Sequence, residues 1–447
     1  MTVDSVPFDS ADRVKNAKRS LIGAIFYSFN DMPTSELTEQ KPRLRLIAIC
    51  VLALLSAVAP IATDMYLPGF PLIAEDLNAG ASGVLLTLTS FLVGLALGQL
   101  IIGPVSDRYG RRIPLLVGTL LAIVSGFLCA VVPNIGSLVV LRALQGFGGA
   151  AGVVLARAII ADRAPDMMTA ARQTQIMMVI GGVAPILAPI TGTFIVSAAG
   201  WRTVFVVIAS LSLIAFAGVL RFIDESLPEE RRIEVTGAAL RGTIKKLFQH
   251  RLYVGYTLVT GFSFMALFGY ISASSFVFQN VLGLSPTQFA FAFGANAFGI
   301  ILFGSASAQL VSRIPPRRLI LISLTILLIA ALTLLILVVA GAGPVFILPA
   351  TFLAVASVGP ILGNSSALAI RAVPETAGMA SAVLGALQFG LGALATPLVG
   401  LRGESDALPM SLVMASAGVA SLIAFVFLTR SSKTAVLDEA SPCLESC

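Results

Sequence analysis

The stretch LRLIAICVLALLSAVAPIATDMYLPGFP at residues 44–71 decides the fold class. It is almost wholly apolar up to Asp64, and no acid precedes that residue within it. A helix rises about 1.5 Å per residue, so a run of this length crosses the roughly 30 Å of hydrocarbon in a bilayer. The stretch therefore predicts a membrane-spanning helix.

Asp64 has two interpretations. A carboxylate at the bilayer centre costs about 2.5–3.5 kcal/mol on insertion scales, so an acid in such a run needs a physical reason. Either Asp64 marks the water-facing end of the first span, or it is a protonatable group that faces an internal cavity. Pro60, one turn earlier, frees a backbone carbonyl and is typical of bent helices that line cavities. The run by itself leaves both interpretations open.

The whole chain has the composition of a membrane protein. Its 447 residues are 57% hydrophobic and 12% charged, with a mean hydropathy of +0.95, whereas soluble domains are about 25% charged. This excludes an ordinary water-soluble protein and predicts an all-α integral membrane protein with twelve transmembrane helices. The twelve apolar runs lie near residues 44–67, 82–102, 113–132, 137–160, 174–197, 202–222, 252–279, 286–311, 318–341, 344–370, 376–400 and 407–429.

The basic residues indicate the orientation of the chain. If both termini are placed inside, all but three of the 29 Lys and Arg residues fall on the inner side. The exceptions are Arg202 and Arg402 in outer loops and Arg142 within a span. The positive-inside rule therefore predicts that both termini are cytoplasmic. It also explains the net charge of +6 without a nucleic-acid partner.

A polar central loop divides the spans into two sets of six. The predicted parts are a leader (1–43), an amino-terminal bundle (44–222), the central loop (223–251), a carboxyl-terminal bundle (252–429) and a tail (430–447). The leader is expected to be a cytoplasmic segment. A signal peptide is the alternative, although no small-residue cleavage site follows its short apolar patch.

The two halves repeat weakly at an offset of 206 residues. VSDRYGRR at 105–112 aligns with VSRIPPRR at 311–318, and each piece follows the second span of its half. Transporters that rock two bundles about a central site are built from such parallel repeats. At this offset Asp64 aligns with Tyr270, so the acid is not repeated.

The strongest motif is GPVSDRYGRRIPL at 103–115, which is expected to be a loop after the second span. Gly103 would let helices approach closely. Asp107 would either accept hydrogen bonds from nearby arginines or face a helix N-terminus, where negative charge is favoured. Gly110 would supply the backbone freedom for a tight reversal. A basic loop serving topology alone explains the arginines but not the acid and the two glycines.

This motif resembles the cytoplasmic signature of the major facilitator superfamily. That signature runs Gly, three residues, Asp, Arg, one residue, Gly, Arg, then Arg or Lys. The resemblance implies a twelve-helix fold of two six-helix bundles. It also implies a conformational gate formed by Gly103, Asp107, Arg108, Gly110, Arg111 and Arg112.

Further stretches resemble the drug:proton antiporter branch of this superfamily. LRALQGFGGA at 141–150 places Arg142 in apolar surroundings, where an arginine needs polar partners. GGVAPILAPITG at 181–192 looks like the antiporter motif, and GWR at 200–202 opens the sixth span as it does in that branch. The glycines and prolines would let the fifth helix bend and pack tightly, although ordinary packing is the alternative. The motif residues are Gly181, Gly182, Pro185, Pro189 and Gly192.

ATDMYLP at 62–68 is similar to the first helix of Bcr/CflA-type efflux transporters. The resemblance implies proton-coupled efflux of small drugs or antibiotics across the cytoplasmic membrane, with bicyclomycin-like and phenicol compounds as first candidates. Asp64 would bind a proton or a substrate, and Arg142 would tune its affinity. Some relatives carry a second acid where this chain has Ser56, which puts a two-proton mechanism in doubt. The alternative is a proton-linked exporter or importer of a small metabolite.

Polar residues within the spans are candidates for a substrate cavity, since small-molecule sites are apolar with a few polar groups. The candidates are Tyr66, Gln145, Tyr270, Asn296 and Gln388. No histidine–carboxylate cluster, nucleophile elbow or phosphate-binding loop accompanies the single histidine, His250, so the sequence predicts neither an enzyme nor a cofactor or metal site. The expected partners are a small-molecule drug, protons and the lipid bilayer, and the expected state is monomeric.

Overall fold

The computed structural model describes residues 46–232, 237–403 and 405–429, and every regular element in these ranges is helical. Twelve of its segments are long and apolar enough to span a membrane, which confirms the predicted number. The spans of the first half are α2 (Leu46–Asp64) with α3 (Phe70–Asp76), α4 (Gly80–Tyr109), α5 (Arg112–Cys129), α6 (Ile135–Arg163), α7 (Met167–Ala199) and α8 (Trp201–Phe222). Those of the second half are α10 (Arg251–Phe276), α11 (Pro286–Leu310), α12 (Pro316–Val339), α13 (Pro344–Arg371), α14 (Ala377–Val399) and α15 (Leu408–Leu428). The predicted leader (1–43) and tail (430–447) lie outside the described residues.

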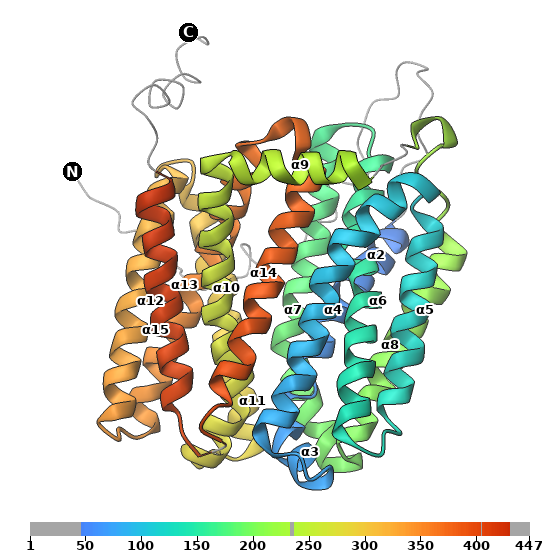
Figure 1. The fold of residues 1–447 in the computed structure, drawn as a ribbon. Helices are drawn as coiled ribbons and strands as arrows, with labels where there is room; N and C mark the ends of the chain where they lie inside the picture. Colours follow the sequence, from blue (N-terminus) through green and yellow to red (C-terminus); the bar gives the residue numbers. More distant parts are fainter. Residues whose placement is uncertain (1–45, 233–236, 404, 430–447) are drawn as a thin grey trace, which may run out of the picture. The chain divides into compact units, whose positions relative to one another are not determined.

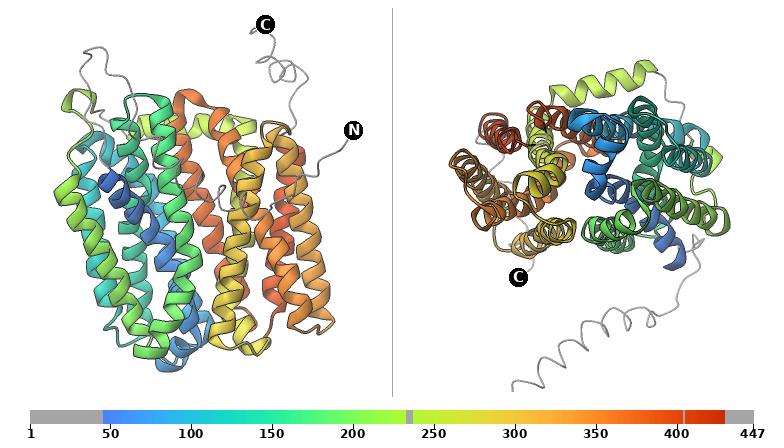
Figure 2. Two further views of the ribbon diagram at one scale, coloured as in Figure 1. Left: turned by 180° about the vertical axis from the view of Figure 1, so that it is seen from behind. Right: turned by 90° about the horizontal axis from the view of Figure 1, so that it is seen from below.

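The helices form two six-helix bundles joined by the segment that carries α9 (Gly237–Gln249) (Figure 1). In the first bundle α6 packs against α4 and α5, and in the second α10 packs against α14 and α15. Between the bundles, α4 packs against α14 and α7 against α11 (Figure 2). The second helix of each half thus meets the fifth helix of the other, as expected for two parallel repeats.

Helix α9 lies across one end of the molecule, and α3 lies at the opposite end (Figure 1). We call these ends the α9 side and the α3 side. Helix α9 contacts α10 and α14.

The first span is interrupted toward the α3 side. Helix α2 ends at Asp64, the 3-10 turn η1 covers Leu67–Gly69, and α3 continues to Asp76. Pro68 and Pro71 lie at the starts of the next two pieces, where the missing N–H of proline is tolerated. The span therefore extends beyond Asp64, which is not its water-facing end.

The motif expected to be a loop after the second span is mostly helical. Helix α4 runs through Gly103 and Pro104 to Tyr109, and the reversal is made by Gly110 with a φ of 86°. This is a left-handed conformation that glycine adopts without strain. The prediction placed the helix end too early, because hydropathy marks where side chains leave the hydrocarbon and not where backbone hydrogen bonding stops.

Glycines bring α4 and α6 into close contact. A Cβ atom on Gly94 would lie 2.1 Å from the carbonyl oxygen of Ala143, and one on Gly146 would lie 2.0 Å from that of Phe91. Backbones can approach this closely only where both surfaces carry small residues. The tight crossing fixes the position of the α6 segment around Arg142.

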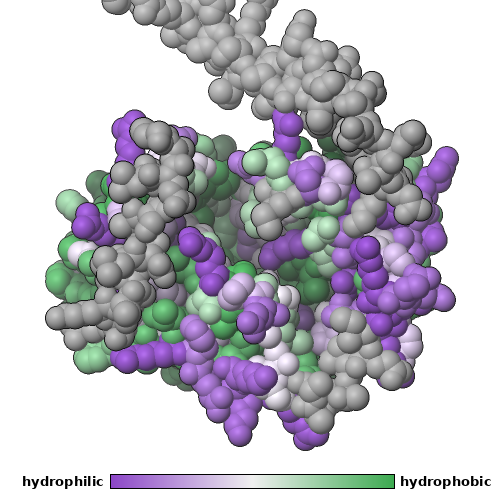
Figure 3. Space-filling model, turned by 90° about the horizontal axis from the view of Figure 1, so that it is seen from above, coloured by the Kyte–Doolittle hydropathy of each residue, from purple (hydrophilic) through white to green (hydrophobic). Residues whose placement is uncertain are grey.

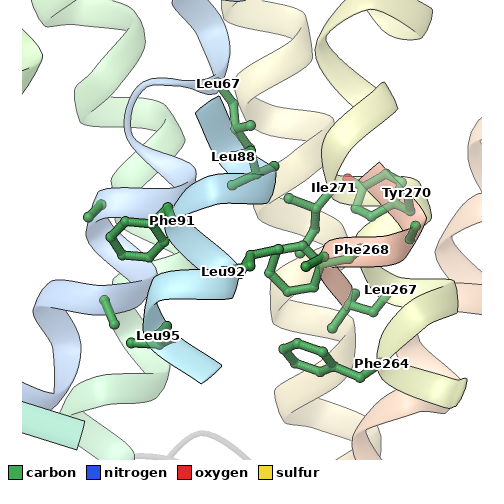
Figure 4. Close-up of a cluster of buried hydrophobic side chains, with 14 of the residues drawn as sticks. Leu67, Leu88, Phe91, Leu92, Leu95, Phe264, Leu267, Phe268, Tyr270 and Ile271 are labelled. Carbon is green, nitrogen blue, oxygen red and sulfur yellow. The ribbon is translucent and has the colours of Figure 1, made fainter. Parts of the chain in front are cut away.

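The bundles meet on the α3 side and separate toward the α9 side. Leu88 and Leu92 of α4 face Phe268 and Ile271 of α10 across the centre (Figure 4). Nearer the α3 side, the rings of Phe70 and Phe276 lie 5.8 Å apart, and the hydroxyl of Ser82 donates to the Gly400 carbonyl at 3.0 Å. Viewed from the α9 side, the space-filling surface is hollowed near its middle (Figure 3).

Candidate functional site

A cavity of about 330 Å³ lies between the bundles, within the range of roughly 300–1,000 Å³ that is usual for small-molecule sites. Its walls are mostly aliphatic and aromatic side chains from both halves of the chain. Asp64 and Arg157 are the charged residues among its lining. The lining residues are Ser56, Ala59, Pro60, Thr63, Asp64, Leu95, Val153, Arg157, Met177, Met178, Gly181, Pro185, Phe264, Leu267, Phe268, Tyr270, Ile271, Phe293, Ala297, Ile300, Val355 and Phe389.

Asp64 lines this cavity at the end of α2 and is only 4% exposed. Its Oδ1 accepts a hydrogen bond from the Thr63 hydroxyl at 3.0 Å, and no ion pair joins it to a basic residue in the described parts of the chain. A helix carboxyl terminus disfavours negative charge, and the surrounding walls are apolar. An ionised carboxylate here is therefore costly unless a proton or a cationic ligand neutralises it.

Arg142 is fully buried and holds the end of α2. Its Nη2 donates to the Ala62 carbonyl at 2.9 Å, and its Nη1 donates to Gln145 Oε1 at 2.7 Å. The last carbonyls of a helix lack intrahelical donors, so Arg142 caps α2 from the side. The guanidinium also lies over the rings of Tyr66 and Phe91, 4.5 and 4.2 Å from their centroids. Arg142 thus acts on the position of Asp64 through its hydrogen bond to the backbone of Ala62, two residues earlier, and forms no ion pair with the Asp64 carboxylate.

Tyr270 lines the opposite wall, on α10. Asn296 donates to its hydroxyl at 2.8 Å, and its ring stacks on Phe293 with centroids 5.5 Å apart. Asp64 and Tyr270 are equivalent positions of the two repeats. The structure therefore places the acid of one half and the phenol of the other on the same cavity.

Four of the expected cavity residues lie outside its lining: Tyr66, Gln145, Asn296 and Gln388. Three of them hold other site residues in place. Tyr66 bonds to the Thr87 hydroxyl at 3.2 Å beneath Arg142, while Gln145 and Asn296 bond Arg142 and Tyr270 as described above. A polar residue in a span was a signal for burial near the site, but the sequence could not show which side of the helix it faced.

Most of the lining residues were not predicted from the sequence, and two of them matter for the chemistry of the cavity. Ser56, which stands where some relatives carry an acid, lies on the cavity wall. Arg157 was counted among the basic residues of the inner side, although it falls within the apolar run 137–160, and it projects from α6 into the cavity. The available signal was the same as for Arg142, namely an arginine within an apolar run.

The motif at 103–112 forms a charged network on the α9 side. Nη1 of Arg111 donates to Asp107 at 2.5 Å and to the Ser106 hydroxyl at 2.6 Å, and its Nε donates to Asp162 at 3.1 Å. The guanidinium of Arg108 lies over the Tyr109 ring, 5.4 Å from its centroid. These bonds join the ends of α4, α5 and α6.

Glu225 completes this network from the segment after α8. Its carboxylate accepts from the backbone N–H groups of Arg111 at 2.8 Å and Arg112 at 3.1 Å, at the start of α5. Partial burial acts to raise the pKa of Glu225, but the hydrogen bonds from Leu227, Arg111 and Arg112 outweigh it and hold that pKa below its ordinary value. Neither Glu225 nor Asp162 was predicted from the sequence, although each is an acid beside the end of a span.

Two packing expectations for glycine were wrong. A Cβ on Gly103 would meet nothing within 4 Å, and the same holds for Gly181, which instead lines the cavity beside Pro185. In the antiporter motif the tight packing is at Gly192, where a Cβ would lie 2.0 Å from the Met65 carbonyl oxygen. A Cβ on Gly182 would touch only Ile301, at 3.7 Å. Pro189 lies within α7, and its carbonyl accepts from Thr193 at 2.9 Å.

Two six-helix bundles around a central cavity define a helical membrane transporter. The chain belongs to the Major Facilitator Superfamily, whose family model matches residues 52–397. It is 37% identical to the uncharacterized MFS-type transporter YdgK of Bacillus subtilis and 32% identical to a bicyclomycin resistance protein homolog of Haemophilus influenzae, and in each comparison 86% of this chain and 96% of the relative are covered.

The fold is also similar to a solved structure of the xylose transporter XylE from E. coli in a partially occluded inward open conformation. The TM-score is 0.65 over 85% of this chain and 98% of that one, with 16% sequence identity. Similarity at this identity shows the fold alone. Membership of the Major Facilitator Superfamily, together with the similarity to these relatives, makes the protein a transporter and not an enzyme.

Proposed function

We propose that this transporter exports small drug-like molecules from the cell in exchange for protons, by alternating access to the cavity between its bundles. The observation that carries the proposal is Asp64, a buried acid that lies in a largely apolar, ligand-sized cavity and forms no ion pair with any basic residue in the described parts of the chain. The name of the Haemophilus influenzae relative, a bicyclomycin resistance protein homolog, supports the same substrate class.

The α9 side is taken as the cytoplasmic side. The motif at 103–112 and helix α9 lie there, and both are rich in arginine or lysine, as the positive-inside rule requires of cytoplasmic loops. The cavity in this conformation then faces the cytoplasm, while the contacts around Phe70, Phe276 and Ser82 close the outer end.

The exchange follows from the cost of charge at Asp64. Protonation removes the uncompensated charge, and a proton from outside can be released to the cytoplasm when the cavity opens on the α9 side. Arg142 acts as a positioning residue, since its bond to the Ala62 carbonyl fixes where α2 ends and thus where Asp64 lies. The network around Arg111 braces the first bundle, so that the bundle moves as a unit.

A susceptibility panel in a host that lacks its own efflux pumps tests the proposal. Cells that express the wild type should tolerate higher concentrations of a phenicol or a bicyclomycin-like compound than cells with an empty vector. The Asp64→Asn variant, at equal membrane expression, should lose this protection. Inward accumulation of a metabolite by vesicles, with no drug protection, would favour the proton-linked metabolite carrier instead.

A further inference from the structure

Arg157 is a charged cavity residue that the proposed proton exchange does not use. It lies on α6 four residues after Val153, so both side chains project from the same face of the helix into the cavity. No hydrogen bond, ion pair or ring contact joins the Arg157 side chain to another residue in the described ranges. The nearest acid along α6, Asp162, is engaged by Arg111 and the Ser226 hydroxyl.

Asp64 and Arg157 lie toward opposite ends of the cavity. Helices α2 and α6 run in opposite directions and touch where Gly152 meets Leu55, since a Cβ there would lie 2.6 Å from the Leu55 carbonyl oxygen. From this level Asp64 is nine residues, or about 13 Å, toward the α3 side. Arg157 is five residues, or about 7 Å, toward the α9 side. The acid therefore lies at the closed end and the arginine toward the open end, with no ion pair between them.

The wall between these two charges suits an aromatic or aliphatic body. The rings of Phe264 and Phe268 lie 4.7 Å apart, and those of Phe264 and Phe389 lie 5.1 Å apart. Met177 and Met178 add flexible thioether side chains that adapt to different ligand shapes.

An arginine exposed to such a cavity favours one class of ligand. Its planar guanidinium offers a fixed fork of donors that matches the two oxygens of a carboxylate or another oxyanion, and it repels cations. We propose that Arg157 determines specificity by binding an oxyanion on a substrate whose apolar body lies against the phenylalanines. The inference rests on the proposed function only in taking this cavity as the substrate site.

The test compares two probes with the same aromatic body and opposite charge, 2-naphthoate and 2-naphthylmethylammonium. Binding to the purified full-length protein in detergent is measured by equilibrium dialysis at neutral pH. The wild type should bind the carboxylate at least about tenfold more tightly than the ammonium, in line with the strength of charge-assisted hydrogen bonds. Arg157→Gln should abolish this ratio. Arg157→Lys should keep part of it, because the charge remains but the fork is lost.

Arg318→Gln is the matched control, since Arg318 is an exposed arginine at the start of α12, outside the cavity. It should retain the wild-type ratio. Equal binding of both probes by the wild type overturns the inference, as does an unchanged ratio in Arg157→Gln. If Arg157→Gln does not fold, the wild-type ratio and the Lys variant decide the question.

These measurements need no proton gradient, so they separate the inference from the proposed function. A carboxylate preference without proton-driven export would leave the inference standing and refute the proposed function. Proton-driven export without the preference would refute the inference alone.

Discussion

The replacement Asp64→Asn has a calculable effect on drug accumulation. Asp64 is the only acid among the described cavity-lining residues, so we expect one proton per transport cycle. At a membrane potential of 100 mV one elementary charge supplies about 2.3 kcal/mol, which supports a concentration ratio of about fortyfold for a neutral drug. Two protons would support about two-thousandfold. The asparagine variant should equilibrate the drug to a ratio near one.

The assay uses proteoliposomes with an imposed potassium diffusion potential, no pH gradient and a radiolabelled neutral phenicol. The wild type should reach a plateau no higher than about fortyfold. Asp224→Asn is the control, because Asp224 is an exposed acid after α8 and outside the cavity. Accumulation by Asp64→Asn equal to that of the wild type would refute the assignment of Asp64. A wild-type plateau far above fortyfold would refute the single-proton count.

Three further predictions concern structural roles. Arg142→Lys should lower the free energy of unfolding in detergent by about 2–4 kcal/mol. The reason is that the lysine ammonium cannot replace both guanidinium hydrogen bonds, the one to the Ala62 carbonyl and the one to Gln145. An unchanged denaturation midpoint would show that the cap is unimportant. Gly192→Ala should lower the free energy of unfolding by about 1–3 kcal/mol, because the new Cβ clashes with the Met65 carbonyl oxygen; this is measured as a lower melting temperature. Gly181→Ala is the control and should have little effect, since a Cβ there meets nothing within 4 Å. Similar melting-temperature shifts in both variants would contradict the packing argument. Glu225→Gln should lower the melting temperature at pH 7. The folded-state pKa of Glu225 lies below its ordinary value of 4.5, so its stabilising contribution is present above pH 4.5 and is lost as the pH falls through the folded-state pKa. The difference in melting temperature between Glu225→Gln and the wild type should therefore shrink in acid. A melting-temperature difference that does not change with pH would refute the ionic character of the network.

Much of the fold follows from local properties of the sequence. Each span must satisfy its own backbone hydrogen bonds and match the bilayer thickness, so it can be recognised from its own apolar run without knowledge of the helices that pack against it. The first span is not determined by local properties alone. Its apolar run places Asp64 near an end, but the break after α2 and the continuation to Asp76 depend on Pro68 and Pro71 and on the capping of α2 by Arg142.

The residues of the site could be predicted from the sequence only in part, because they come from helices far apart in the chain. The apolar surroundings of Asp64 and Arg142 marked both as unusual, yet the sequence suggested a direct influence of one on the other where the structure shows a backbone-mediated one. Arg157 was counted only as an inner-side charge, because hydropathy does not distinguish a side chain that leaves the membrane from one that enters a cavity.

The sequence by itself determined that this protein has twelve membrane helices in two repeated sets, and it singled out Asp64. Tertiary structure alone decided which residues share a cavity. Helix rotation and crossing are set by close contacts such as Gly94 with Ala143, and these are properties of pairs of helices. For that reason Tyr66 lies behind the wall, while Arg157 and Tyr270 lie on it.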